Sequence, residues 1–225
     1  MNTEQSQVIA GYTWEQLESR LYSAVISDIL DDLGYRHQTI DSGIRPLDRN
    51  LKLLGRAFTV LAAEVFEVPQ KPYQMQMEAV DSMEPGEIFV VHTGAPTGAA
   101  FWGELLSTAC RARGGRGALV DGLNRDSGKI LEMAFPLFSR GQLPTDSKGR
   151  IDVIQYQVAV DIGGVTVQPG DLIFGDMDGL AVVPQHIEEE TIRKAIEKAE
   201  GENQVREALL EGMFCTEAFK TFGIL

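Results

Sequence analysis

Five apolar residues near the start of the chain recur every four positions, namely Leu17, Leu21, Val25, Ile29 and Leu33. Residues that are four apart lie on one face of a helix, so this pattern predicts a helix over residues 14–33. Thr13, followed by Gln16, is the pattern of a capping box at the start of that helix. Gly34 is the pattern of a helix that ends there.

Shorter apolar runs farther along the chain predict β-strands. Residues 57–65 and 88–92 are rich in β-branched and aromatic side chains, and a helix is expected between them over residues 73–82. The second half of the chain contains further strand-like runs that are separated by turns of Gly and Asp. A Pro-Gly-acid turn precedes an apolar run twice, at Pro85 and at Pro169, which hints at an internal structural repeat.

The C-terminal segment is highly charged and is predicted to be helical up to about residue 210. Its apolar positions form one narrow stripe, namely Ile192, Ala195, Ile196, Ala199, Val205 and Leu209. Gly201 interrupts this stripe. A narrow stripe on a long polar helix suits packing on a neighbouring subunit better than insertion into a core. We therefore expect one compact α/β domain over residues 1–184, followed by a helical extension over residues 185–225 that packs on a neighbouring subunit.

The composition is that of a globular chain and argues against several classes of protein. Of the 225 residues, 44% are hydrophobic and 24% are charged, which is enough apolar surface for a core. The formal net charge of −13 argues against binding to nucleic acid or to an anionic membrane, since both need a basic surface. The chain shows no signal-peptide pattern and no apolar run that could span a membrane. We expect a soluble, cytoplasmic protein.

The stretch from residue 89 to residue 126 carries the candidate chemistry. It is predicted to run as strand, glycine-rich loop, helix and strand, and it ends in Asn124, Arg125 and Asp126. A helix in this order presents its N-terminus at the carboxyl end of the preceding strand. The free N–H groups and the positive dipole end there bind a carboxylate or a phosphate without any basic side chain. Arg125 and Asp126 should lie at the same edge, because they follow the next strand.

A dinucleotide site is one alternative for this stretch. Asp121 follows Gly98 by 23 residues, a separation similar to that of the ribose-binding acid in dinucleotide-binding folds. The loop from Gly94 to Gly98, however, lacks the G-x-G-x-x-G spacing, and Pro96 removes one amide that would bind phosphate. The nucleotide-binding interpretation is therefore disfavoured.

Arg125 and Asp126 allow two interpretations. They form an exposed charge pair without a function, or Asp126 binds a hard divalent cation while Arg125 points at a substrate oxygen. One carboxylate with several waters suits Mg²⁺ or Mn²⁺. The three histidines, at positions 37, 92 and 186, lack the spacing of zinc ligands. His92, at the end of a predicted strand, is assigned a structural role.

One further pattern of glycines and charged residues spans residues 103–126. It comprises Gly103-Glu104-Leu105-Leu106, Gly114, Gly117, Val120-Asp121-Gly122 and Arg125-Asp126. Shorter matches support it at residues 27–30, 55–57, 169–171 and 175–184. The chain thereby resembles the RraA-like family. This family includes class II pyruvate aldolases that act on 4-hydroxy-4-methyl-2-oxoglutarate, with oxaloacetate decarboxylases in the same branch, and the regulator of ribonuclease E activity.

The resemblance implies an α/β fold, a layered β/β/α sandwich of the swivelling-domain type, which assembles as trimers or hexamers. It also implies a lyase that cleaves a 4-hydroxy-2-oxo acid by a retro-aldol step, or decarboxylates oxaloacetate, through a pyruvate enolate. Arg125 would bind the C2 oxygen and stabilise the enolate, and Asp126 would hold Mg²⁺ or Mn²⁺. The backbone amides of four residues would hold the substrate carboxylate, namely Gly103, Glu104, Leu105 and Leu106.

Lys129 departs from the family pattern, which often has an acid three residues after the metal ligand Asp126. An acid from a neighbouring subunit would then support the metal, and Glu202 on the C-terminal helix is the candidate. Substrate choice depends on the walls of the site. The candidates for those walls are Phe101, Trp102, Arg140 and the loop over residues 139–150.

Two other functions stay open. One is a non-catalytic regulator that binds a ribonuclease or another protein partner. That type is shorter and lacks a long C-terminal helix, so the extension favours the aldolase branch. The other is a lyase or hydrolase that acts on a different 2-oxo or sugar acid. A methyltransferase, a label attached to such sequences, is disfavoured because the chain has no glycine-rich loop for S-adenosylmethionine.

Overall fold

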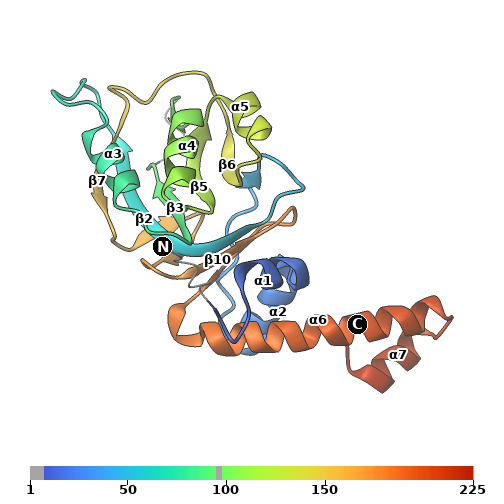
Figure 1. Ribbon diagram of the computed structural model, residues 1–225. Helices are drawn as coiled ribbons and strands as arrows, with labels where there is room; N and C mark the ends of the chain where they lie inside the picture. The colour runs from blue at the N-terminus through green and yellow to red at the C-terminus, as the bar shows by residue number, and fades with distance from the viewer. Residues whose placement is uncertain (1–7, 95–97, 225) are drawn as a thin grey trace, which may run out of the picture.

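A computed structural model describes residues 8–94 and 98–224 (Figure 1). Pro96, which argued against a nucleotide-binding loop, lies outside these ranges. Within them, no helix is long and apolar enough to cross a membrane. The helices are α1 (Trp14–Arg20), α2 (Ser23–Asp32), α3 (Gln74–Asp81), α4 (Glu104–Ala112), α5 (Ser127–Glu132), the 3₁₀ turn η1 (Gln185–Ile187), α6 (Glu188–Leu210) and α7 (Cys215–Phe222). The strands are β1 (Arg45–Pro46), β2 (Leu53–Glu64), β3 (Glu87–His92), β4 (Ala100–Trp102), β5 (Gly117–Asn124), β6 (Leu137–Gln142), β7 (Ile151–Tyr156), β8 (Val160–Ile162), β9 (Val165–Val167), β10 (Leu172–Gly175) and β11 (Leu180–Val183).

The first predicted helix is in fact two helices, α1 and α2, because the backbone is extended at Leu21 and Tyr22. The capping box that begins at Thr13 is present, as predicted. The start of α2 is capped from a distant part of the chain. The Asp176 carboxylate accepts hydrogen bonds from the Ser23 backbone N–H at 2.7 Å and from the Ser23 hydroxyl at 2.6 Å. This carboxylate satisfies N-terminal donors of the second helix, which explains why a new helix begins there.

The main sheet is mixed and has the strand order β1-β6-β5-β3-β2-β10-β11, with β4 beside β5 and β7 beside β2. Strands β2, β3, β5 and β6 run parallel, whereas β7 and β10 pair antiparallel with β2. The two Pro-Gly-acid turns introduce strands β3 and β10, as predicted. These two strands flank β2 on opposite sides and run in opposite directions.

Alternate residues of the parallel strands face two different cores. In β3, Phe89 and Val91 share a core with residues of α3, α4 and α5. Ile88 and Val90 face a second layer of strands, formed by β8, β9, β10 and β11. A strand that is buried on both faces is apolar throughout, which confirms the buried strand predicted over residues 88–92.

Strands β10 and β11 of this second layer are also apolar on both faces. In β10, Ile173 faces the parallel strands, whereas Leu172 and Phe174 pack against the outer helices α1, α2 and α6. Figure 1 shows these helices on the side of the sheet opposite α3, α4 and α5. The order of layers is therefore helices, strands, strands and helices. This arrangement confirms the predicted α/β fold, a layered β/β/α sandwich with additional helices.

Helix α6 confirms the helix predicted up to about residue 210 and corrects one expectation about its packing. Four apolar residues of its first half are buried in a core with α2 of the same chain, namely Ile192, Ala195, Ile196 and Ala199. The expectation that this stripe avoids a core was therefore wrong for the first half. The helix also continues through Gly201, where an added Cβ would lie 2.7 Å from Ile224 Cδ1, so this glycine allows close packing of the chain end.

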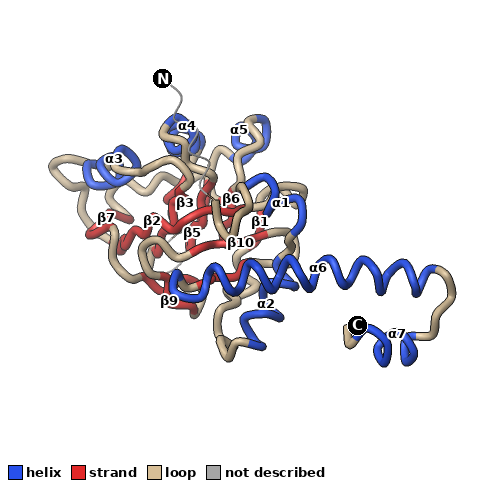
Figure 2. The backbone as a smooth tube through the Cα atoms, turned by 60° about the horizontal axis from the view of Figure 1, so that its bottom comes forward, coloured by secondary structure: helices blue, strands red, loops and turns tan. Residues whose placement is uncertain are grey.

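Beyond Gly201, α6 and α7 project from the layered body as an arm, which Figures 1 and 2 show from two directions. The arm carries exposed apolar side chains, among them Leu210, Phe214 and Phe219. The domain boundary at residue 184 and the packing of this arm on a neighbouring subunit stay predictions.

Candidate active site

The candidate site lies where two parallel strands end side by side. Strand β4 pairs with β5 so that Trp102 lies opposite Asn124. The next residues along the two strands, Gly103 and Arg125, are therefore neighbours, and the Arg125 backbone N–H donates to the Trp102 carbonyl oxygen at 2.8 Å. Gly103 is the N-cap residue of α4, and Asp126 is the N-cap residue of α5. The strand order thus brings two helix N-termini to one edge of the sheet.

Gly103 is the point of closest contact in this arrangement. A Cβ atom added to Gly103 would lie 2.8 Å from Asp126 Oδ2 and 3.3 Å from Arg125 Cγ. The absence of a side chain lets the Glu104 backbone N–H donate to Asp126 Oδ2 at 3.2 Å. Asp126 adopts the left-handed conformation, with φ of 58°, which Asp and Asn tolerate better than most residues. The geometry therefore favours glycine at position 103 and Asp or Asn at position 126.

A buried polar network fixes the end of β5. The Asn124 side chain donates to Ser127 Oγ at 2.9 Å and accepts from Ser139 Oγ at 2.7 Å. Asn124 and Ser139 are buried, so these hydrogen bonds satisfy groups that water does not reach. They tie β5 to α5 and to β6, and so hold the backbone on either side of Arg125 and Asp126.

The strand ends open into a cavity of about 240 Å³ between α3, α4 and the loop that follows β6. Its lining consists of Tyr73, Gln76, Met77, Ala100, Phe101, Gly103, Leu105, Leu106, Arg125, Asp126, Asp146 and Ser147. Most of these side chains are apolar or uncharged. A concave site with a few convergent polar groups is the usual form of a small-molecule site.

Asp146 holds Arg125 inside this cavity. Arg125 Nη1 lies 3.2 Å from Asp146 Oδ1, and Arg125 Nε lies 3.8 Å from Asp126 Oδ2. The Tyr73 hydroxyl donates a hydrogen bond to Asp146 Oδ2. The guanidinium group is therefore held between two carboxylates, and the second of these is itself positioned by a phenol.

These contacts set the protonation states of Asp146 and Tyr73. Burial raises the pKa of Asp146, but the hydrogen bond from Tyr73, the charge of Arg125 and two backbone N–H groups outweigh burial, so the pKa is lowered overall. Burial, the hydrogen bond to Asp146 and the charge of Asp146 raise the pKa of Tyr73 to about 12. At neutral pH the cavity therefore contains an ionised Asp146 and a protonated Tyr73.

The sequence pattern does not single out Tyr73 or Asp146 as site residues. Tyr73 falls only at the start of the helix predicted over residues 73–82. The loop over residues 139–150 lines the cavity, as expected, and does so through Asp146 and Ser147. The backbone of this loop lies beside β4, where the Ala100 N–H donates a hydrogen bond to the Thr145 carbonyl oxygen at 2.8 Å. One signal in the sequence could have found Asp146. It is an acid in the loop after β6, and β6 ends at the same edge of the sheet as β5.

Five predicted site residues line the cavity, namely Gly103, Leu105, Leu106, Arg125 and Asp126. The backbone N–H of Glu104 donates a hydrogen bond to Asp126 Oδ2. Glu202 is not part of this group, because within one chain it lies on α6 and accepts a hydrogen bond from Tyr22. Lys129 is an exposed residue of α5.

Two of the candidate wall residues were wrong. Trp102 is fully buried, and its indole N–H donates to Ser107 Oγ at 2.8 Å. Arg140 pairs with Asp41 at 2.8 Å and with Asp121, and it does not line the cavity. Phe101, by contrast, does line the cavity, as expected.

A second polar cluster lies at the end of β3, where His92 pairs with Asp121 in the middle of β5. His92, Asp121 and Asp161 place possible metal-ligand atoms within 4.8 Å of one another, which their spacing in the sequence did not reveal. The two Asp121 oxygens, however, accept from the Arg140 side chain and from the Gly163 backbone N–H. His92 Nδ1 lies 2.7 Å from the Asp161 backbone oxygen. The adjacent guanidinium and these contacts favour a structural tie between the β8–β9 hairpin and the sheet over a metal centre.

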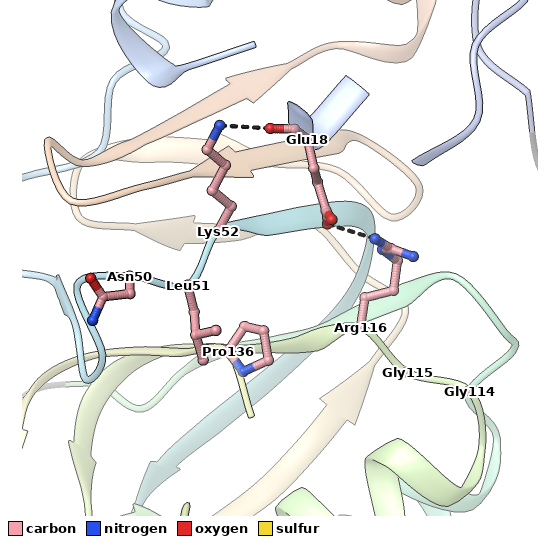
Figure 3. A pocket seen from close by; sticks show the side chains of 8 residues that line it. All are labelled: Glu18, Asn50, Leu51, Lys52, Gly114, Gly115, Arg116 and Pro136. Atoms are coloured by element: carbon pink, nitrogen blue, oxygen red, sulfur yellow. Dashed lines mark hydrogen bonds and ion pairs between the residues drawn. The ribbon is translucent and has the colours of Figure 1, made fainter. Parts of the chain in front are cut away.

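A larger cavity, of about 550 Å³, lies at the opposite ends of the parallel strands (Figure 3). Its basic residues are already paired. Lys52 Nζ donates to the backbone oxygens of Glu18 and Leu21 at 2.6 and 2.7 Å, and Arg116 pairs with the Glu18 carboxylate at 2.6 Å. Figure 3 shows both basic side chains meeting at Glu18. These contacts join the end of α1 to the starts of β2 and β5, which is a structural role.

The chain matches known proteins over most of its length. The family model RraA-like, described as Aldolase/RraA, matches residues 23–182. The protein named "Putative 4-hydroxy-4-methyl-2-oxoglutarate aldolase" of Halalkalibacterium halodurans is 31% identical over 195 residues. That alignment covers 86% of this chain and 87% of the relative.

Solved structures share the fold. One, described as that of novel cellulases from microbes associated with the gut ecosystem, has a TM-score of 0.80, with 27% identity and 91% of each chain covered. Streptomyces coelicolor RraAS2, described as an unusual member of the RNase ES inhibitor RraA protein family, has a TM-score of 0.74. It is 29% identical, and the match covers 87% of this chain and 97% of RraAS2. Fold and sequence together define a layered α/β protein of one class: the chain belongs to the RraA-like family.

Proposed function

We propose that the chain is a lyase that cleaves a 4-hydroxy-2-oxo acid by a retro-aldol step, or decarboxylates oxaloacetate, through a pyruvate enolate with a divalent metal ion. The observation that carries this proposal is the convergence of the α4 N-terminus, Arg125 and Asp126 on one cavity. These groups supply an anion site, a fixed cation and an oxygen ligand, which are the parts that enolate chemistry requires. The relative that is named as an aldolase supports the same class of reaction.

The N-terminus of α4 would bind the carboxylate of the substrate. The first intrahelical bond of α4 runs from Ser107 N–H to Gly103 O at 3.1 Å. The N–H groups of Leu105 and Leu106 precede that bond and have no helical partner. Together with the helix dipole, they favour an anion placed against them. Arg125 follows the adjacent strand end, so a 2-oxo acid bound in this way would direct its C2 oxygen at the guanidinium.

Arg125 would stabilise the charge that develops as the bond breaks. In the retro-aldol step the proton of the C4 hydroxyl passes to solvent, and C4 leaves as the carbonyl carbon of an aldehyde or ketone. The electron pair of the broken C3–C4 bond forms the enolate of pyruvate. Loss of CO₂ from C4 of oxaloacetate leaves the same enolate. Its negative charge lies largely on the C2 oxygen, where a guanidinium already held by Asp146 stabilises it without reorganisation. Protonation at C3 then gives pyruvate.

Asp126 fits the role of a ligand for a hard divalent cation. Its side chain is 42% exposed, and among the residues described only its Oδ2 has a hydrogen-bond partner, the Glu104 N–H. Mg²⁺ and Mn²⁺ prefer oxygen ligands, and Mg²⁺ in particular keeps several waters, so one carboxylate can suffice. When bound, such an ion supplies Lewis-acid polarisation of the substrate oxygens.

Coupled detection of pyruvate tests the proposal. The protein is assayed with Mg²⁺ or Mn²⁺ on several 4-hydroxy-2-oxo acids and on oxaloacetate, and turnover of at least one is expected. Arg125→Ala should lower kcat by about 10²–10³, the usual effect of removing one preorganised oxyanion donor. Arg113→Ala is the matched control, since Arg113 forms an exposed pair with Asp81. Near-wild-type turnover by Arg125→Ala would overturn the assigned role, and no turnover of any substrate would overturn the lyase.

Glu202 is proposed to support the metal site of a neighbouring subunit in a trimer or hexamer. In its own chain it does not line the cavity, and it lies where the arm begins to leave the body. Mixed oligomers of Arg125→Ala and Glu202→Gln subunits distinguish the two possibilities. If Glu202 acts on a neighbour, mixing restores part of the activity, because some sites receive both native residues. A monomeric active protein, or mixing without recovery, would contradict this role.

A regulator that binds a protein partner is the second candidate, because RraAS2 has the same fold over almost its whole length. The fold alone therefore does not separate an enzyme from an inhibitor. Pyruvate formation that depends on Arg125 favours the lyase, whereas binding to a ribonuclease that survives Arg125→Ala favours the regulator.

A hydrolase of the kind named for one solved structure is less suited to this cavity. Glycosidases use two carboxyl groups, and one of these is an acid with a raised pKa that protonates the leaving group. Here Asp126 and Asp146 both lie beside Arg125. The pKa of Asp146 is lowered, so this carboxyl group is a poor proton donor.

A further inference from the structure

We propose that the cavity selects 4-hydroxy-2-oxo acids that carry a single carboxylate, and discriminates against substrates that carry a second carboxylate beyond C3. This inference rests on the proposed function and narrows its substrate class. It follows from a difference in charge between two parts of the lining: the α4 N-terminus and Arg125 form a positive part, and Asp146 forms a negative part.

The proposed binding mode assigns the positive part to the first two carbon atoms of the substrate. The α4 N-terminus takes the C1 carboxylate, and Arg125 takes the C2 oxygen. Carbon atoms C3 and C4 and their substituents must then be accommodated by the rest of the lining. That remainder consists of Tyr73, Gln76, Met77, Phe101, Asp146 and Ser147.

Asp146 makes this remainder unfavourable for an anion. Its side chain is only 34% exposed, so solvent screens its charge incompletely. Among the described residues that line the cavity, Arg125 is the one cation, and in the bound state it faces the C2 oxygen. Lys148 and Arg150 of the same loop are exposed and do not line the cavity. With Arg125 and the ion proposed at Asp126 both directed at the oxygens of C1 and C2, a second carboxylate would face Asp146 without a cation of its own, which discriminates against it.

The same groups suit a neutral C4 substituent with a hydroxyl group. An ionised carboxylate accepts hydrogen bonds, so Asp146 can accept one from the C4 hydroxyl. Met77 and Phe101 offer apolar surface to a hydrogen or a short alkyl group on C4. Both oxaloacetate and 4-hydroxy-4-methyl-2-oxoglutarate carry a further carboxylate, so both should be poorer substrates.

A matched pair of substrates tests the selection. 4-Hydroxy-2-oxopentanoate and 4-hydroxy-2-oxoglutarate have the same chain length and differ in a terminal methyl or carboxylate group. We expect kcat/KM to be at least about tenfold higher for the monocarboxylate, which corresponds to about 1.4 kcal/mol. Asp146→Asn should reduce that ratio by at least about fivefold. Because the ratio compares two substrates of one variant, a general loss of activity in Asp146→Asn cancels.

Ser147→Ala is the control, since Ser147 is an uncharged neighbour in the same wall. It should leave the substrate ratio unchanged. Added salt should lower the ratio in the wild type, because a charge effect is screened and a steric effect is not. A ratio that favours the dicarboxylate, or one that Asp146→Asn does not change, would overturn the selection.

Binding measurements keep this inference separate from the proposed activity. If neither substrate yields pyruvate, the lyase proposal fails, and calorimetry with 2-oxopentanoate and 2-oxoglutarate still tests the selection. The monocarboxylate should bind at least about tenfold more tightly, and Asp146→Asn should narrow the difference. Equal affinities in the wild type would overturn the selection whatever the outcome of the activity assay.

Discussion

Replacing Gly103 by alanine tests how strictly the site depends on the close approach of the backbone. The added Cβ would lie 2.8 Å from Asp126 Oδ2 and 3.3 Å from Arg125 Cγ, whereas ordinary contacts begin at 3.4 Å. The Asp126 carboxylate or the start of α4 must therefore move by about half an ångström. Since a misplacement of about 1 Å can cost on the order of 10² in rate, we expect kcat to fall about 10- to 100-fold.

The fold should survive this change. The Gly103 backbone is extended, with φ of −154° and ψ of −175°, so alanine adopts it without strain. The close contact is with the end of a side chain that can rotate. Alanine is a poorer N-cap residue than glycine, by on the order of 1 kcal/mol or less. For a chain of this size, that corresponds to a fall in Tm of roughly 2–4 °C at most.

Pyruvate formation and thermal unfolding are measured in parallel for the wild type, Gly103→Ala and Gly128→Ala. Gly128 lies in α5, two residues after Asp126, and a Cβ added there meets nothing within 4 Å. This control should keep the wild-type kcat and gain up to about 1 kcal/mol of stability, because alanine is the better helix former. Full activity of Gly103→Ala would refute the claim that the site needs the close contact between Gly103 and Asp126. Failure of Gly103→Ala to fold would refute the claim that the fold tolerates alanine at this position.

Three further predictions concern the metal, the pH response and the outer helices. Treatment with EDTA should abolish turnover, and Mg²⁺ or Mn²⁺ should restore it; turnover that EDTA leaves unchanged would exclude the proposed metal dependence. The pKa of Asp146 is lowered in the folded protein from its usual 3.8. Ionised Asp146 therefore stabilises the folded state above about pH 4, and this stabilisation is lost as the pH falls through the lowered pKa. The difference in Tm between the wild type and Asp146→Asn should therefore narrow below about pH 4. Ile192→Ala, at a fully buried position of α6, should lower the free energy of unfolding by about 2–5 kcal/mol in urea titrations; a loss near zero would contradict packing of α6 on its own chain.

Local patterns in the sequence predicted much of the candidate site. The run of strand, loop, helix and strand predicted that Gly103 and Arg125 share one edge, because parallel neighbours end at the same side of a sheet. Strand β4, which pairs with β5 and leads into Gly103, lies within the predicted loop and was not predicted. Gly103 also indicates the site, because Asp126 occupies the space that a side chain at position 103 would need. The buried strand over residues 88–92 follows from its continuous apolar run.

Contacts between distant segments could not be predicted in this way. Tyr73 and Asp146 are 73 residues apart, and each lies in an unremarkable polar stretch of the sequence. The break before α2 depends on Asp176, which is 153 residues from Ser23. For α6, the apolar stripe indicates which face is buried but not which partner covers it. These failures share one cause, because periodicity describes a single element and not its neighbour.

The alternation of side chains in β3 and β10 has a consequence for how such a molecule diverges. The cavity wall rests on one hydrophobic core, and the outer helices rest on another, with a core of strands between them. Mutations that reshape the substrate pocket therefore need no repacking around α1, α2 and α6, and the reverse also holds. Residues that shape the substrate pocket and residues that hold the outer helices can therefore change separately. Strands β10 and β11 contribute both to the core of strands and to the core under the outer helices, so a substitution in them can disturb two cores at once.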